Sequence, residues 1–140
     1  MSNFQMILIA ITWAVIFITL IFYGLRRYLN RIKPDYFKQK WLELQRLCAD
    51  RKTWPQAVTC ADSLLQEALK KRRMKGKSMG EKLAAAQHQL SNNDSVWYAH
   101  NLAKKLVEKP NHRLREADIK KALVGVRQAL RDLGALRDAK

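Results

Sequence analysis

A run of eighteen uncharged residues, from 6 to 23, constrains this chain more than any other feature of its sequence. With its neutral flanks the stretch covers residues 4–25. As a helix rising ~1.5 Å per residue, it is roughly 33 Å long and can cross a hydrocarbon core of about 30 Å. Its internal polar side chains, Thr12 and Thr19, can hydrogen-bond back to the preceding helical turn. The sequence therefore predicts a transmembrane helix over residues 4–25.

A cleaved signal peptide and a buried core helix are the two alternatives for this stretch. A signal peptide has a basic segment before its apolar region and a small-residue cleavage site after it. Residues 1–5 contain no basic side chain, and residues 23–27 contain no A-x-A pattern. We therefore expect a retained anchor that spans the membrane once.

Basic residues follow the apolar stretch directly. Arg26, Arg27, Arg31 and Lys33 lie at its C-terminal end, whereas its N-terminal end carries only the α-amino group. Positive flanks of membrane spans remain on the cytoplasmic side. The sequence thus predicts a single-pass protein of the cell membrane, with its N-terminus outside and its C-terminal domain in the cytoplasm.

The net charge of +15 falls entirely on the residues after the anchor, because residues 1–25 have no charged side chain. A surface of this sign suits anionic phospholipid headgroups, nucleic acid or an acidic protein face. Near an anionic leaflet each Lys or Arg gains about 1 kcal/mol. The candidate binding residues are the four cations after the anchor and a second run within residues 70–77: Lys70, Lys71, Arg72, Arg73, Lys75 and Lys77.

Beyond a basic juxtamembrane linker over residues 26–37, residues 38–138 are expected to form one cytoplasmic domain. Apolar residues recur there with helical period, and no segment alternates with strand period. A continuous apolar stripe, typical of a helix that faces the core, consists of Ala57, Ala61, Leu64, Leu65, Ala68 and Leu69. The predicted fold class is all-α: the transmembrane helix followed by an antiparallel bundle of about five helices. Their expected ranges are residues 36–49, 54–73, 79–90, 95–108 and 115–133.

Local signals mark several of these helix ends. Thr53 with Gln56, and Ser78 with Glu81, have the spacing of capping boxes. Gly134 is suited to close the last helix, because a glycine readily adopts the left-handed conformation found there.

The sequence contains no motif of a known active site. There is no glycine-rich phosphate loop, no HExxH and no Gly-x-Ser-x-Gly. Cys48 and Cys60 lack the spacing of zinc ligands, so we expect neither a metal nor a cofactor. We expect both cysteines to be small, partly buried side chains on neighbouring helices. His100 follows Trp97 by three residues and is expected on the same helix face. We interpret it as a hydrogen-bonded core or interface residue rather than as a catalyst.

Short strings across the soluble part resemble a set of uncharacterised single-span bacterial proteins. The cytoplasmic part of those proteins is similar to HEPN domains, helical bundles that often dimerise and that include toxin and defence ribonucleases. The resemblance implies a helical domain that could act with a second copy or with another protein. The strings that carry it are WLELQ at 41–45, Trp54 with Ala57–Val58, ADSLL at 61–65, EALK at 67–70, MGEKL at 79–83, VWYAH at 96–100 and ALRDLGAL at 129–136.

The ribonuclease members carry an Arg-polar-x-x-x-His motif, and this chain departs from it. In register behind His100, the motif positions fall on Ala103, Lys104 and Glu108. Alanine cannot bind phosphate, and glutamate provides no proton shuttle near neutral pH.

Two functional hypotheses follow from this departure. The favoured one is a membrane-anchored, non-enzymatic binding or scaffold module with a basic cytoplasmic surface. The alternative is a membrane-tethered ribonuclease with a displaced active site, in which His100 acts with His112 and Arg113.

Overall fold

The computed structural model describes residues 2–29 and 31–137. The chain divides into two compact units, Met1–Arg31 and Ile32–Lys140. The first unit contains α1 (Asn3–Leu29), and no residue of this helix is buried. The hydroxyls of Thr12 and Thr19 each donate to the carbonyl three residues earlier, at 2.8 Å, as expected. Among the described residues, α1 is the one helix long and apolar enough to cross a membrane.

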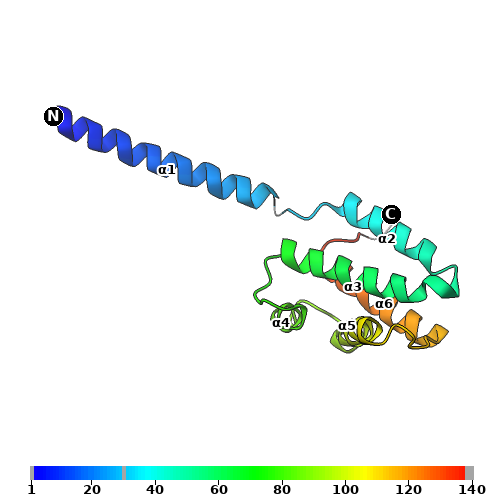
Figure 1. Cartoon of the computed structure of the whole chain (residues 1–140). Coiled ribbons are helices and arrows are strands. Elements are labelled where there is room, and N and C mark those ends of the chain that lie inside the picture. The colour runs from blue at the N-terminus through cyan, green and yellow to red at the C-terminus, as the bar shows by residue number, and fades with distance from the viewer. Residues whose placement is uncertain (1, 30, 138–140) are drawn as a thin grey trace. The chain divides into compact units, whose positions relative to one another are not determined.

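The second unit is a helical bundle, and the described residues contain no strand, so the predicted fold class is confirmed (Figure 1). α2 and α3 run antiparallel and side by side, and α6 packs against both α3 and α5. In Figure 1 α5 is seen nearly end-on, so it crosses α3 rather than running along it. The helices are α2 (Pro34–Leu47), a 3₁₀ turn η1 (Arg51–Thr53), α3 (Trp54–Lys71), α4 (Met79–Ala85), α5 (Asn93–Glu108) and α6 (Glu116–Asp132).

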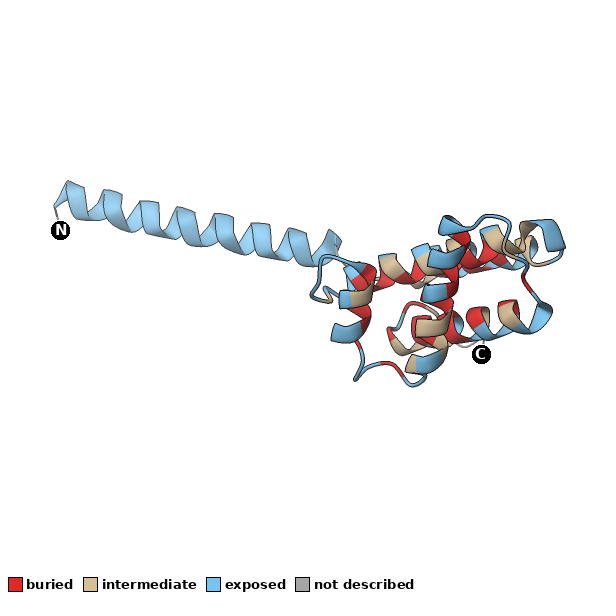
Figure 2. Ribbon diagram, turned by 60° about the horizontal axis from the view of Figure 1, so that its bottom comes forward, coloured by how far each residue is buried: buried red, intermediate tan, exposed pale blue. Residues whose placement is uncertain are grey.

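The hydrophobic core forms around α3, which contacts α2, α4, α5 and α6. Buried side chains line the inner faces of these helices, whereas α1 is exposed along its whole length (Figure 2). The fully buried side chains of largest volume are Phe37, Leu65, Leu69, Leu83, Leu130 and Leu133. Every member of the apolar stripe expected on α3 is buried: Ala57, Ala61, Leu64, Leu65, Ala68 and Leu69.

The turn between α2 and α3 differs from the sequence prediction. Thr53 forms no side-chain cap, so the predicted Thr53–Gln56 capping box is wrong. Its hydroxyl instead donates to the carbonyls of Leu47 and Asp50, which closes the turn behind α2. The indole of Trp54 donates to the carbonyl of Cys48 at 2.9 Å. The bonds to Leu47 and Cys48 satisfy carbonyls at the end of α2 that have no partner within the helix.

α4 is shorter than expected, because it ends at Ala85 instead of continuing to residue 90. Its start agrees with the sequence: Ser78 and Glu81 form both hydrogen bonds of the predicted capping box. Beyond α4, the side-chain amide of Asn93 donates to the carbonyls of Gln87 and Leu90. The nearby Asn93 side chain thus bonds to two carbonyls of the non-helical segment that follows α4.

α5 and α6 approach each other closely at Gly125. A Cβ atom placed on Gly125 would lie 2.7 Å from the backbone carbon and oxygen of Ser95. Only a residue without a side chain fits this contact. At the end of α6, Gly134 has φ +76° and follows the C-cap Leu133, as the sequence predicts.

Candidate functional site

The four cations predicted to follow the membrane anchor are all exposed. Arg26 and Arg27 lie in the last turn of α1, and Arg31 and Lys33 lie between α1 and α2. Among the described residues, none of the four has an acidic partner within ion-pair distance. Their charges are therefore available to a ligand outside the chain.

The second basic run, residues 70–77, covers the end of α3 and the turn after it. Lys75 and Lys77 are exposed. Arg72 also has a structural role, because its Nε donates to the carbonyl of Leu133 at 2.6 Å and so caps the end of α6. The run thus combines exposed cations with one that joins two helices.

Arg73 has a left-handed backbone, with φ 56°. It ends α3 in a double hydrogen-bonded turn: Arg73 N–H donates to the carbonyl of Lys70, and Met74 N–H to that of Leu69, both at 3.0 Å. Glycine is the usual residue at this position of such a turn, because a Cβ atom strains the left-handed conformation. Arg73 therefore carries its positive charge on a residue whose backbone is strained.

His100 is paired with Asp62, an acidic residue of α3 that the sequence analysis did not associate with it. His100 Nδ1 lies 3.0 Å from Asp62 Oδ1, and its ring meets Trp97 edge-on at 6.2 Å between centroids. His100 is buried, and the Asp62 side chain is 18% exposed. The arrangement agrees with the interpretation of His100 as a hydrogen-bonded core residue.

Burial raises the pKa of Asp62 above its ordinary value of 3.8, although the charge and hydrogen bond of His100 act in the opposite direction. Folding therefore favours the protonated carboxyl. The stability gained in this way is fully present below pH 3.8 and is lost as the pH rises through the higher folded pKa.

We expect the free energy of unfolding of Asp62→Asn, measured relative to that of the parent chain, to increase as the pH rises from about 3.8 towards neutrality. Asparagine cannot ionise, yet its carbonyl oxygen still accepts from His100. Urea unfolding of both chains in detergent, at several pH values across this range, measures the difference. If the advantage of Asp62→Asn in free energy of unfolding became smaller with rising pH, the raised pKa of Asp62 would be contradicted.

The structure separates His100 from His112 and Arg113, the residues with which it would form a displaced ribonuclease site. His112 and Arg113 line a pocket with Asn101 and Lys105, which lie on the opposite face of α5. His100 instead faces Asp62 on α3. The three residues of the alternative site are thus not brought together.

The motif positions of the HEPN-like resemblance do not form a phosphate site either. Ala103 is a core residue with 4% exposure, whereas Lys104 and Glu108 are exposed. Lys104 is the single cation among these three positions. Nothing in this arrangement pairs a proton-transfer group with a phosphate-binding arginine.

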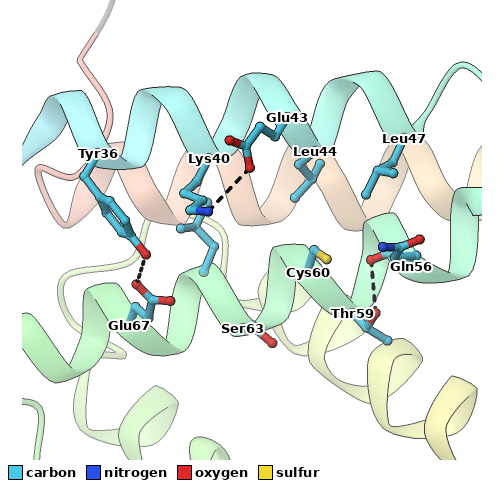
Figure 3. Close-up of a pocket in the computed structure, with 11 residues that line it drawn as sticks. Tyr36, Lys40, Glu43, Leu44, Leu47, Gln56, Thr59, Cys60, Ser63 and Glu67 are labelled. Atoms are coloured by element: carbon cyan, nitrogen blue, oxygen red, sulfur yellow. Dashed lines mark hydrogen bonds and ion pairs between the residues drawn. The ribbon is translucent and has the colours of Figure 1, made fainter.

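A groove of about 500 Å³ lies between α2 and α3 (Figure 3). Leu44 and Leu47 reach into it from α2. At one end the hydroxyl of Tyr36 donates to Glu67 Oε2 at 2.9 Å. Because two glutamates and a single lysine line the groove, its charge is net negative and it is a poor site for phosphate.

Two expectations about the cysteines have different outcomes. Cys48 is partly buried, as predicted, and burial raises the pKa of its thiol. Cys60 is exposed on α3, because it lies outside the apolar stripe of that helix, so its expected partial burial is wrong. Across residues 2–29 and 31–137, no group of three or more His, Cys, Asp or Glu residues could hold a metal ion.

Comparison with known proteins adds no assignment to these sites. No protein-family model matches the chain, and no curated protein or solved structure is significantly similar to it.

Proposed function

We propose that this protein is a single-pass membrane-anchored binding or scaffold module, whose basic helical domain docks on anionic phospholipid headgroups at the cytoplasmic face. The observation that carries the proposal is α1: it is 27 residues long, exposed throughout and free of charged side chains up to Leu25, and exposed cations lie in its last turn and shortly after it. In water such a helix would expose a large apolar surface, which lipid removes.

The charge distribution supports the choice of headgroups over other partners. The anchor holds the domain within reach of the inner leaflet, where each nearby Lys or Arg gains about 1 kcal/mol from anionic lipid. The exposed cations at and after the end of α1, and those in residues 70–77, offer many such contacts. No paired catalytic groups accompany them in the described residues, so the module is proposed to be non-enzymatic.

Cys60 provides a test of the proposed orientation, because its thiol is exposed on the helical domain. A membrane-impermeant maleimide is expected to label the full-length chain in inverted membrane vesicles and not in intact cells. The chain should also remain in the membrane pellet after alkaline carbonate extraction. Cys60→Ser, which keeps Cys48, is the matched control. Labelling of Cys60 in intact cells, or release by carbonate, would overturn the proposed topology.

Docking on headgroups is tested with the full-length chain in nanodiscs. Energy transfer from a dye on Cys60 to labelled headgroups should increase when phosphatidylglycerol replaces phosphatidylcholine, and should decrease with added salt. Neutralising three exposed cations of residues 70–77 should lower the docked-to-undocked ratio by at least about tenfold, since each is worth about 1 kcal/mol. The variant is Lys70→Gln with Lys75→Gln and Lys77→Gln.

A second triple variant removes the same charge elsewhere on the domain. It consists of Lys104→Gln, Lys109→Gln and Arg127→Gln, all at exposed positions. We expect this control to dock nearly as well as the parent chain. Equal losses in the two triple variants would show that net charge alone decides docking, and would contradict the assignment of residues 70–77.

A further inference from the structure

A second cavity, of about 570 Å³, lies where α5, the following loop and the start of α6 meet. We call it the α5–α6 pocket. Its cations are Lys105 of α5, Arg113 of the loop and Arg115 at the N-cap of α6, and His112 lies beside them. Binding cavities for small ligands are typically ~300–1,000 Å³, so the pocket has room for a small organic molecule.

The pocket has an excess of positive charge that the chain itself does not neutralise. Its one acidic lining residue, Asp118, accepts hydrogen bonds from the backbone N–H of Arg115 at 3.0 Å and from its Nε at 3.3 Å. These bonds lower the pKa of Asp118, which therefore remains ionised and paired with Arg115. Lys105 and Arg113 have no acidic partner among the described residues. Two cations thus remain for an anionic ligand.

One wall of the pocket is apolar and fixed in position. Leu102 is 7% exposed, and the hydroxyl of Tyr98 donates to Asp118 Oδ1 at 3.0 Å, which holds the tyrosine ring in place. Lys121 Nζ lies over the same ring, 4.4 Å from its centroid. The pocket therefore combines a cationic side with a rigid aromatic and aliphatic side.

We propose that the α5–α6 pocket binds a small phosphate monoester, with its phosphate on Arg113 and Lys105 and its organic part against Tyr98 and Leu102. A guanidinium group matches the geometry of phosphate oxygens with two parallel hydrogen bonds, and a lysine adds a point charge. The ester can be a soluble metabolite or the headgroup of phosphatidate. These residues are separate from those of the proposed headgroup surface, so either assignment can fail without the other.

The test is isothermal titration calorimetry of the full-length chain in neutral detergent micelles, with two probes. Adenosine monophosphate represents a soluble ester, and dioctanoyl phosphatidate represents a lipid headgroup. Saturable binding of either probe is expected, and the probe that binds identifies the source. Arg113→Gln should weaken that binding by about tenfold or more, because a charged hydrogen bond contributes about 1.5–3 kcal/mol.

Arg127→Gln makes the same change at an exposed position of α6 outside the pocket and outside the proposed headgroup surface, and it should change the affinity less than twofold. Arg113 is exposed, so its replacement is expected to leave the unfolding temperature unchanged, which the same samples can report. Absence of binding by both probes, or equal weakening by Arg113→Gln and Arg127→Gln, would overturn the proposal. If inorganic phosphate bound as tightly as the better of the two probes, Tyr98 and Leu102 would not bind the organic part of the ester.

Discussion

Gly125→Ala is expected to destabilise the helical domain by about 2–3 kcal/mol, because the added methyl group collides with the backbone of α5. The new Cβ atom would lie 2.7 Å from the carbonyl carbon and oxygen of Ser95. A backbone cannot rotate away as a flexible side chain does, so α5 and α6 must separate. Alanine favours the helix over glycine by about 1 kcal/mol, which offsets only part of the loss.

Thermal unfolding of the full-length chain in detergent, followed by tryptophan fluorescence, measures this effect. For a domain of about 100 residues the unfolding temperature should fall by roughly 10–20 °C. Gly80→Ala is the matched control, because its Cβ atom would meet the Trp97 ring at an ordinary 3.5 Å. An unfolding temperature for Gly125→Ala equal to that of the control would show that the two helices are not held at this contact.

Leu65→Ala is expected to lower the free energy of unfolding by about 3–4 kcal/mol. Leu65 is fully buried in the middle of α3, the helix that contacts each of the other four helices of the domain. Truncation removes buried methyl groups and leaves a cavity that packed helices fill only in part. A loss of this size is a large fraction of the stability of a small domain.

Urea unfolding in detergent measures the effect of Leu65→Ala. Leu42→Ala provides the comparison, since Leu42 lies on α2 with 48% of its surface exposed and should change the free energy by less than about 1 kcal/mol. If both substitutions had similar effects, α3 would not be the centre of the core.

Much of the fold could be predicted from the sequence, because the signals are local. The apolar stripe of α3, the Ser78–Glu81 capping box and the closing glycine at position 134 all act within a few residues of one another. Helical period and cap chemistry are sufficient to identify such features. The apolar length of α1 is a signal of the same kind.

The features that the sequence did not reveal depend on residues far apart in the chain. Asp62 and His100 are separated by 38 positions, and Arg72 reaches the carbonyl of Leu133 across 61 positions. No local spacing relates such residues, so only the packing of α3 against α5 and α6 brings them together. The α5–α6 pocket arises in the same way, since its cations come from two helices and the loop between them.

The left-handed turn at Arg73 has a consequence for how this domain can be optimised. A non-glycine residue in that conformation costs about 1–2 kcal/mol, so a glycine would relax the end of α3 and also remove a positive charge from the surface. Thermal robustness and attraction to anions therefore oppose each other at this single position. Selection for heat resistance alone would therefore favour, at position 73, a residue without positive charge.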